Sequence, residues 1–109
     1  GKVQRLEEEK ARARAGLEFA REYARIAEEK LELARSANQR AETRAAMAED
    51  HLLLHPQPPQ EIVEEVRDAR EAVKRAKDEY AKSASDYRAT LKAYERACEM
   101  FAEVYGEEL

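Results

Sequence analysis

Apolar and small residues recur along most of the chain at alternating spacings of three and four residues. This pattern repeats every seven residues, which is the period of the contact face in a left-handed coiled coil. It runs without a shift through each half of the chain and stops once, near the middle. We therefore predict two long helices, residues 1–54 and 60–106, about 80 and 70 Å long at 1.5 Å per residue. The repeating positions, here called the seam, are Val3, Leu6, Lys10, Ala13, Leu17, Ala20, Ala24, Ala27, Leu31, Ala34, Asn38, Ala41, Ala45, Ala48 and Leu52, then Ile62, Val66, Ala69, Val73, Ala76, Tyr80, Ser83, Tyr87, Thr90, Tyr94, Ala97, Phe101 and Val104.

The interruption is the segment HPQPP, residues 55–59, which contains all three prolines of the chain. Proline has no N–H and pushes the residue before it out of the helical conformation, so the first helix must stop there. Pro59 suits the first turn of a new helix, and Gly106 suits the end of that helix, which leaves residues 107–109 as a tail. Two helices joined by about five residues fold back on each other. The predicted fold is all-α, an antiparallel two-helix coiled-coil hairpin forming one structural unit.

Large and small residues of the seam match in size when the hairpin is folded about its proline loop. Residues whose numbers sum to about 114 then lie opposite each other. Each large residue of the second half meets an alanine, as close packing of two helices requires. The expected pairs are Val66 with Ala48, Val73 with Ala41, Tyr80 with Ala34, Tyr87 with Ala27, Tyr94 with Ala20 and Phe101 with Ala13.

A second apolar row lies beside the seam on the first helix, interrupted by Lys30, Arg40 and Arg44. Single apolar residues are common on protein surfaces, but a row with the same seven-residue period is typical of a wider bundle or a binding groove. We predict that this row binds a protein, either a second copy of the chain in a four-helix bundle or a partner helix. The residues of this row, here called the flank, are Gly16, Phe19, Tyr23, Ile26, Leu33, Ala37, Met47 and Leu54, and the second helix adds Ala81, Ala84, Leu91, Cys98, Ala102 and Tyr105 beside its own seam.

The hairpin tip offers a second candidate surface. Residues 49–68 contain six acidic residues and one arginine, around the leucines at positions 52–54. Leu52 belongs to the seam, but Leu53 and Leu54 cannot both follow it inward. The acids can serve the start of the second helix while the leucines close the hairpin end. The alternative interpretation is a projecting arm whose tip docks into an ATPase, a polymerase or another machine.

Composition and charge narrow the class of protein. Of 109 residues, 40% are charged and 43% are hydrophobic, which is typical of long helices and not of a disordered chain. A net charge of −4 gives no attraction to phosphate backbones, so we expect no nucleic-acid partner. No stretch suits a membrane span or a signal peptide, and the single Cys98 cannot form an intrachain disulfide, so we expect a cytoplasmic protein. Gly1 and an uncapped first helix suggest a fragment of a longer coiled coil.

Candidate chemistry is sparse, and we expect neither an enzyme nor a cofactor. The sequence has no Gly-rich phosphate loop, and no serine or cysteine has a histidine positioned to activate it. His51 and His55 have the i,i+4 spacing that can hold a metal ion, but Pro56 disturbs this turn and no second ligand pair follows. Two solvated histidines at a helix end are the favoured interpretation, and Cys98 is expected to be a packed thiol rather than a reactive one.

Overall fold

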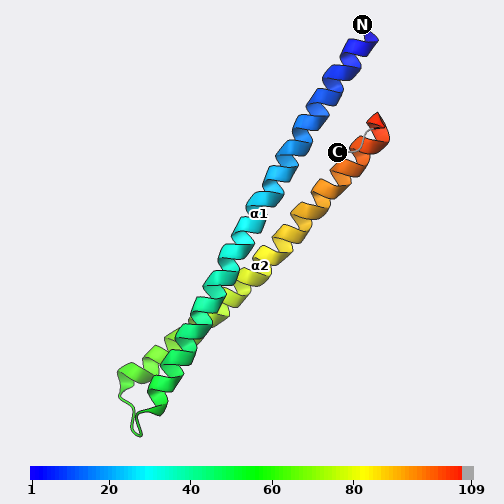
Figure 1. Cartoon of the computed structure of the whole chain (residues 1–109). Helices are drawn as coiled ribbons and strands as arrows, with labels where there is room; N and C mark the ends of the chain where they lie inside the picture. Colours follow the sequence, from blue (N-terminus) through cyan, green and yellow to red (C-terminus); the bar gives the residue numbers. More distant parts are fainter. Residues whose placement is uncertain (107–109) are drawn as a thin grey trace. The chain divides into compact units, whose positions relative to one another are not determined.

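A computed structural model describes residues 1–106 of the chain. Two α-helices account for nearly all of them, α1 (Lys2–Leu53) and α2 (Gln60–Tyr105), and these described residues include no strand (Figure 1). The helices pack antiparallel to each other and are joined by a short loop. The all-α helical hairpin predicted from the seven-residue pattern is therefore confirmed.

The proline loop sets the helix ends at the tip. Helix α1 ends at Leu53, and Leu54, which we placed in the helix, lies in the turn that follows it. The N–H of His55 donates to the carbonyl of Leu52 over 3.1 Å, closing a tighter turn than an α-helix allows. Pro56 causes this early stop because it bars His55 from the helical region. Helix α2 begins on the other side of the loop, where the N–H of Ile62 donates to the Pro59 carbonyl over 3.1 Å.

Gly106 ends α2. Its φ of 67° lies in the left-handed region, which glycine adopts at little steric cost. Its N–H donates to the carbonyl of Ala102 over 2.8 Å, which satisfies one of the last carbonyls of the helix. The predicted tail, residues 107–109, lies outside the described residues.

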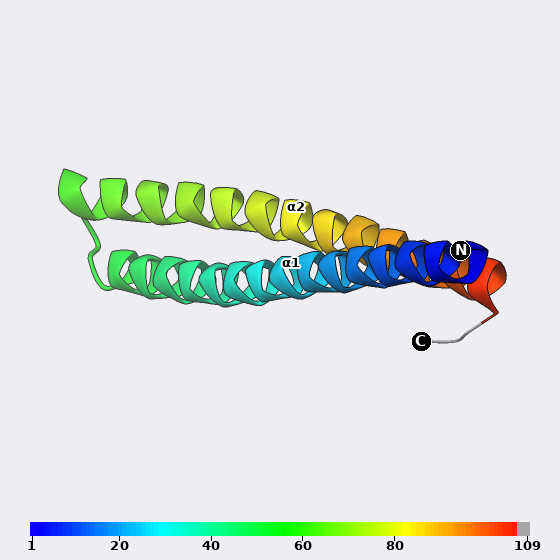
Figure 2. The ribbon, with the colours of Figure 1, turned by 90° about the horizontal axis from the view of Figure 1, so that it is seen from above.

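Contacts divide the chain into two compact units. The tip unit, Lys30–Ala84, contains the loop and the helical segments on either side of it (Figure 2). Its core is built from small seam residues, of which Ala69 is 0% and Ala48 is 2% exposed. The predicted pairing of Val66 with Ala48 is confirmed, since both belong to one cluster of buried side chains. That cluster is Ala45, Ala48, Val66 and Ala69, with Leu52 and Val73 packed against it.

Polar contacts flank the seam of the tip unit. The Nε of Arg35 donates to the hydroxyl of Tyr80 over 3.2 Å, and this bond raises the pKa of the arginine. The Nε of Arg70 lies 2.9 Å from a carboxylate oxygen of Glu49. The phenol of Tyr80 therefore has a partner at the edge of the seam, as a half-buried hydroxyl requires.

Asn38 is the polar member of the seam in the tip unit. Its Oδ1 is buried, with no hydrogen-bond partner among the described residues, while its Nδ2 donates to Glu42 over 3.5 Å. A buried acceptor left unsatisfied costs about 1–3 kcal/mol. In coiled coils a polar seam residue can fix the register of the helices at the expense of stability, and Asn38 occupies such a position.

The terminal unit comprises residues 1–29 and the described residues 85–106. Its most buried seam residues are Phe101, at 4% exposure, and Leu17, at 6%. The ring of Phe101 lies 4.8 Å from that of Tyr105, and the guanidinium of Arg14 lies 5.7 Å from its centroid. Aromatic packing thus takes the place that small aliphatic residues have in the tip unit.

Three predicted seam residues are exposed in the terminal unit. Val3 and Leu6 are 77% and 53% exposed, and Val104 is 69% exposed. The first two would face positions numbered 108 and above, outside the described residues, so no described side chain covers them. Val104 falls opposite Lys10, whose long charged side chain shields it only in part. The seam is therefore shorter at this end than the sequence pattern suggested.

Candidate partner-binding surfaces

The flank of α1 is exposed in the terminal unit. Phe19 and Tyr23 are 69% and 59% exposed, and Ile26 is 39% exposed. The rings of Phe19 and Tyr23 have centroids 5.7 Å apart and pack on each other at the surface. The seven-residue period explains this exposure, because the flank is turned away from the seam that α2 covers. An exposed aromatic pair therefore lies beside an aliphatic side chain on the surface of this unit.

The flank is more polar in the tip unit. Leu33 and Met47 are 70% and 67% exposed, whereas Ala37 is half-buried. Met47 borders a shallow groove that is otherwise lined by polar side chains, including Arg40 and Arg44. The apolar character of the flank therefore weakens from Leu33 toward the tip.

An apolar groove of about 410 Å³ lies beside the flank in the terminal unit. Gly16 contributes its bare backbone from α1, and Met100 and Val104, 64% and 69% exposed, contribute from α2. Sequence reasoning placed Val104 in the seam and did not consider Met100 as part of a surface. Met100 directly precedes the seam residue Phe101, just as Gly16 directly precedes the seam residue Leu17. This shared position beside the seam is the sequence signal that could have identified Met100. The groove is lined by Ala13, Gly16, Leu17, Ala97, Met100, Phe101, Val104 and Tyr105.

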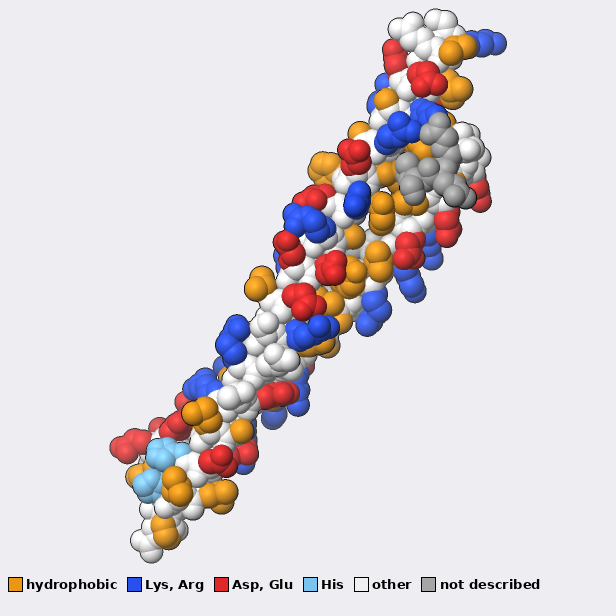
Figure 3. Space-filling model, in the orientation of Figure 1, with side chains coloured by type: hydrophobic (Ala, Val, Ile, Leu, Met, Phe, Trp, Pro, Cys, Tyr) orange, Lys and Arg blue, Asp and Glu red, His pale blue; other side chains and the backbone are white. Residues whose placement is uncertain are grey.

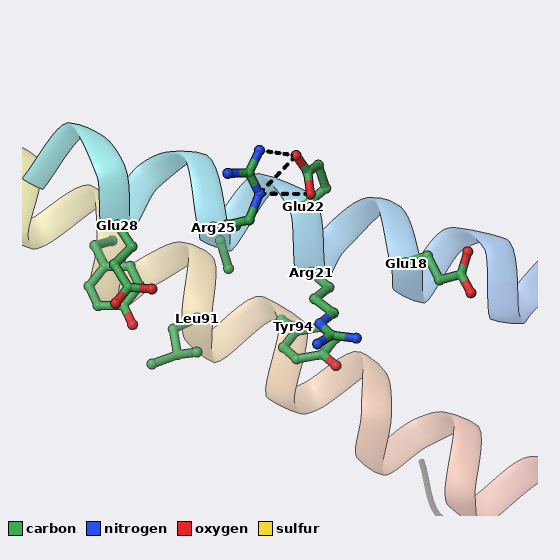
Figure 4. A pocket seen from close by; sticks show the side chains of 9 residues that line it. Glu18, Arg21, Glu22, Arg25, Glu28, Leu91 and Tyr94 are labelled. Atoms are coloured by element: carbon green, nitrogen blue, oxygen red, sulfur yellow. Dashed lines mark hydrogen bonds and ion pairs between the residues drawn. The ribbon is translucent and has the colours of Figure 1, made fainter.

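A second groove of the terminal unit, of about 530 Å³, has a charged border (Figure 4). Tyr87, Leu91 and Tyr94 line its α2 side, and Arg21 extends from α1 to lie beside Tyr94. A hydrogen bond with the Cys98 thiol, followed by partial burial, raises the pKa of Tyr94, and the nearby Arg21 cation opposes this rise. The half-buried, free Cys98 thus has the phenol of Tyr94 as a hydrogen-bond partner.

Ion pairs on the outer face of α1 border this second groove. The Nε of Arg25 donates to the carboxylate of Glu22 over 3.0 Å, and the same guanidinium also contacts Glu29. The bond to Arg25 lowers the pKa of Glu22, and the two carboxylates together raise the pKa of Arg25. In Figure 4 the Glu22–Arg25 pair points away from α2. These contacts are local to one helix and fully exposed to solvent, so they contribute little to stability.

Charged and apolar side chains also alternate on the face drawn in Figure 3. In the part of the molecule formed by residues 1–29 and 85–106, apolar side chains lie between the two helices, with acidic and basic side chains on either side. Such a border of charges around an apolar row resembles the anatomy of a protein interface, which has an apolar centre and a polar rim.

The hairpin tip exposes both of the predicted leucines. Leu53 and Leu54 are 82% and 77% exposed, among the acidic residues that surround the loop. Nδ1 of His51 lies 3.6 Å from a carboxylate oxygen of Glu65, and the rings of His51 and His55 are 5.2 Å apart, edge to face. Within residues 1–106, no group of three or more His, Cys, Asp or Glu side chains is arranged to hold a metal ion.

Neither a protein-family model, nor a curated protein, nor a solved structure matches the chain. Among the described residues, neither helix is apolar enough over the length that a bilayer crossing requires.

Proposed function

We propose that the protein is a non-enzymatic coiled-coil interaction module, a scaffold or adaptor, that packs another α-helix along the flank of α1. The observation that supports this role is the exposure of Phe19, Tyr23, Ile26 and Leu33 in a row on one helix. Burying one such side chain fully contributes about 1.5–3 kcal/mol, so covering the row is favourable. The single free Cys98 suits a reducing compartment such as the cytoplasm.

The proposed occupant of the flank is a second copy of the chain. A two-fold axis lets one surface serve both subunits, and two hairpins joined in this way form a four-helix bundle. The heptad pattern supports this assembly, because the flank repeats the three-and-four spacing by which helices pack in bundles.

Sedimentation equilibrium of the wild type and of an Ile26→Glu, Leu33→Glu variant tests the proposal. We expect a dimer for the wild type and a variant that is monomeric, with dimerisation weakened more than about 100-fold, because two carboxylates would enter an apolar contact. The variant should keep its helical circular dichroism, since the seam is unchanged. Glu28→Gln, Glu32→Gln is the matched control, which alters the same turns outside the flank and should leave the dimer intact. A wild type that is monomeric at millimolar concentration would refute the proposal.

A second candidate function is that of an arm whose tip docks into a larger machine. The exposure of Leu53 and Leu54 amid acidic residues favours it, since such a tip fits an apolar pocket with a basic rim. In that case Leu53→Ser, Leu54→Ser should abolish capture of the machine from a cell extract without affecting the mass of the hairpin in solution, whereas the flank variant should still capture it.

A further inference from the structure

The sequence of α1 carries a self-recognition pattern along its flank. Helix α1 is uninterrupted from Lys2 to Leu53, so positions seven residues apart share one face throughout. The flank can therefore be paired with a copy of itself, and each antiparallel register can be tested for size and charge.

In the intramolecular seam, the two alternating positions of the three-and-four pattern face each other. The pair of Val66 and Ala48 illustrates this, since each comes from a different position of the pattern. When the same rule is applied to two antiparallel copies of the flank, one register places residues whose numbers sum to 49 in the same layer. Its two-fold axis passes between Tyr23 and Ile26.

Size complementarity is high in this register. Tyr23 of each copy packs on Ile26 of the other, which buries these apolar side chains on both sides of the two-fold axis. Leu33, at 70% exposure, meets Gly16, whose missing side chain leaves room for it. A Cβ added at Gly16 has no atom within 4 Å, so the space above this glycine is open. Both of these contacts occur twice because of the symmetry.

Charge complementarity selects the same register. Lys30 meets Phe19, an arrangement in which the ammonium group lies over an aromatic ring. Glu9 meets Arg40, which forms an ion pair at each end of the contact. Two of the three cations that interrupt the flank, Lys30 and Arg40, therefore find partners, whereas Arg44 falls opposite Arg5. In the neighbouring register, where the numbers sum to 56, Arg12 would face Arg44 and Ile26 would face Lys30. That register also pairs apolar residues, Tyr23 with Leu33 and Phe19 with Ala37, but it places Glu9 opposite Met47 and so lacks the ion pair with Arg40.

Helix α2 is compatible with this contact. In the seam register, its positions level with the axis are close to residue 89, and Ala93, seven residues before the Met100 that lines the groove beside Gly16, lies on the same side. Ala93 is small and exposed, so it does not hinder the approach of a second hairpin.

We propose that the chain forms an antiparallel dimer through α1 in which Tyr23 packs on Ile26, Leu33 on Gly16 and Glu9 pairs with Arg40 of the second copy. This inference rests on the proposed function, since it specifies how the flank recognises its own copy. Specificity comes from the charges at the ends of the contact, and affinity from the apolar pairs between them.

Disulfide trapping tests the register. In a Cys98→Ser background, the double variant Tyr23→Cys, Ile26→Cys should give a covalent dimer, as should a mixture of Gly16→Cys and Leu33→Cys chains. The single variants Phe19→Cys and Met47→Cys are controls, because in the proposed register neither residue lies near its own copy. If the wild type is a dimer but Phe19→Cys alone gives the covalent dimer, the register is wrong and the proposed function stands. A monomeric wild type would contradict both.

Charge exchange provides an independent test with the native cysteine retained. Glu9→Arg and Arg40→Glu should each weaken dimerisation roughly ten-fold, because two ion pairs become two repulsions. The double variant should recover most of the wild-type dissociation constant in sedimentation equilibrium. Failure of the double variant to recover, with both single variants weakened, would show that these residues do not face each other.

Discussion

The tip unit and the terminal unit fill the same seven-residue pattern in two different ways. In the tip unit the buried core is aliphatic, and Ala69, Ala48 and Val66 are at most 4% exposed. In the terminal unit the core positions of α2 are rings, of which Phe101 is buried while Tyr87 and Tyr94 are only half-buried. The comparison shows that the aliphatic seam of the tip unit buries its core more completely than the ring positions Tyr87 and Tyr94 of the terminal unit are buried.

The largest loss of stability should therefore come from truncating the buried ring of the terminal unit. Phe101→Ala removes a side chain that is 4% exposed and packs with Tyr105 and Arg14. We expect it to lower the free energy of unfolding by about 3 kcal/mol, measured by urea denaturation with circular dichroism. Val104→Ala, on the same helix but 69% exposed, is the control and should cost less than about 0.5 kcal/mol. Equal losses for both variants would mean that Phe101 is not part of the core.

In the tip unit, enlarging a buried side chain should lower the free energy of unfolding. Ala69 is 0% exposed, so Ala69→Leu forces extra carbon atoms into a filled layer against Val66 and Ala48. We expect a loss of about 1–3 kcal/mol in the same denaturation experiment. Ala81→Leu tests the same change at an exposed position of this unit and should be nearly neutral. If Ala69→Leu is as well tolerated as Ala81→Leu, the tight packing inferred for the tip unit is wrong.

Replacing the polar seam residue of the tip unit by an apolar one should raise the free energy of unfolding. Asn38→Leu removes the buried Oδ1 that has no partner among residues 1–106, and we expect a gain of about 1 kcal/mol in the free energy of unfolding. The same variant should lose some uniqueness of register, visible as additional amide signals in an NMR spectrum. A destabilised variant with an unchanged spectrum would show that Asn38 is satisfied in the folded protein.

The smallest effect concerns the phenol and thiol of the terminal unit. The folded state raises the pKa of Tyr94, chiefly through its hydrogen bond with Cys98, so the neutral phenol is the favoured form. Stability from this bond is present below the pKa of the unfolded tyrosine and is lost as the pH rises through the higher folded pKa. Cys98→Ala should lower the pKa of Tyr94 in an ultraviolet titration from which the Tyr94→Phe curve is subtracted. An unchanged titration would mean that the thiol does not bond to the phenol.

Sequence alone predicted the seam and the turn because both depend on strong local physics. The three-and-four spacing leaves few alternatives to a coiled coil, and Pro56, Pro59 and Gly106 act on the backbone wherever they occur. The exposure of Phe19 was equally predictable, since one covered face implies an uncovered one. The roles of these surfaces stay predictions.

The grooves were not predictable in the same way. They depend on where individual side chains turn at the seam edge, and the sequence does not specify whether Arg21 covers Tyr94 or extends into water. The exposure of Val104 was also missed, because a heptad position counts as buried only where the opposite helix supplies a side chain that covers it.

The proline loop also determines the order in which the hairpin can fold. Joining Val66 to Ala48 closes a loop of about 20 residues, whereas bringing Phe101 directly to Ala13 closes one of about 90, at an additional entropic cost of roughly 1.4 kcal/mol. Each helical turn that packs next to the proline loop shortens the chain loop that the next pair of residues has to close. Folding should therefore begin beside the prolines and zip toward the chain ends, as expected for a topology rich in local contacts. The aromatic layers then form last and open first.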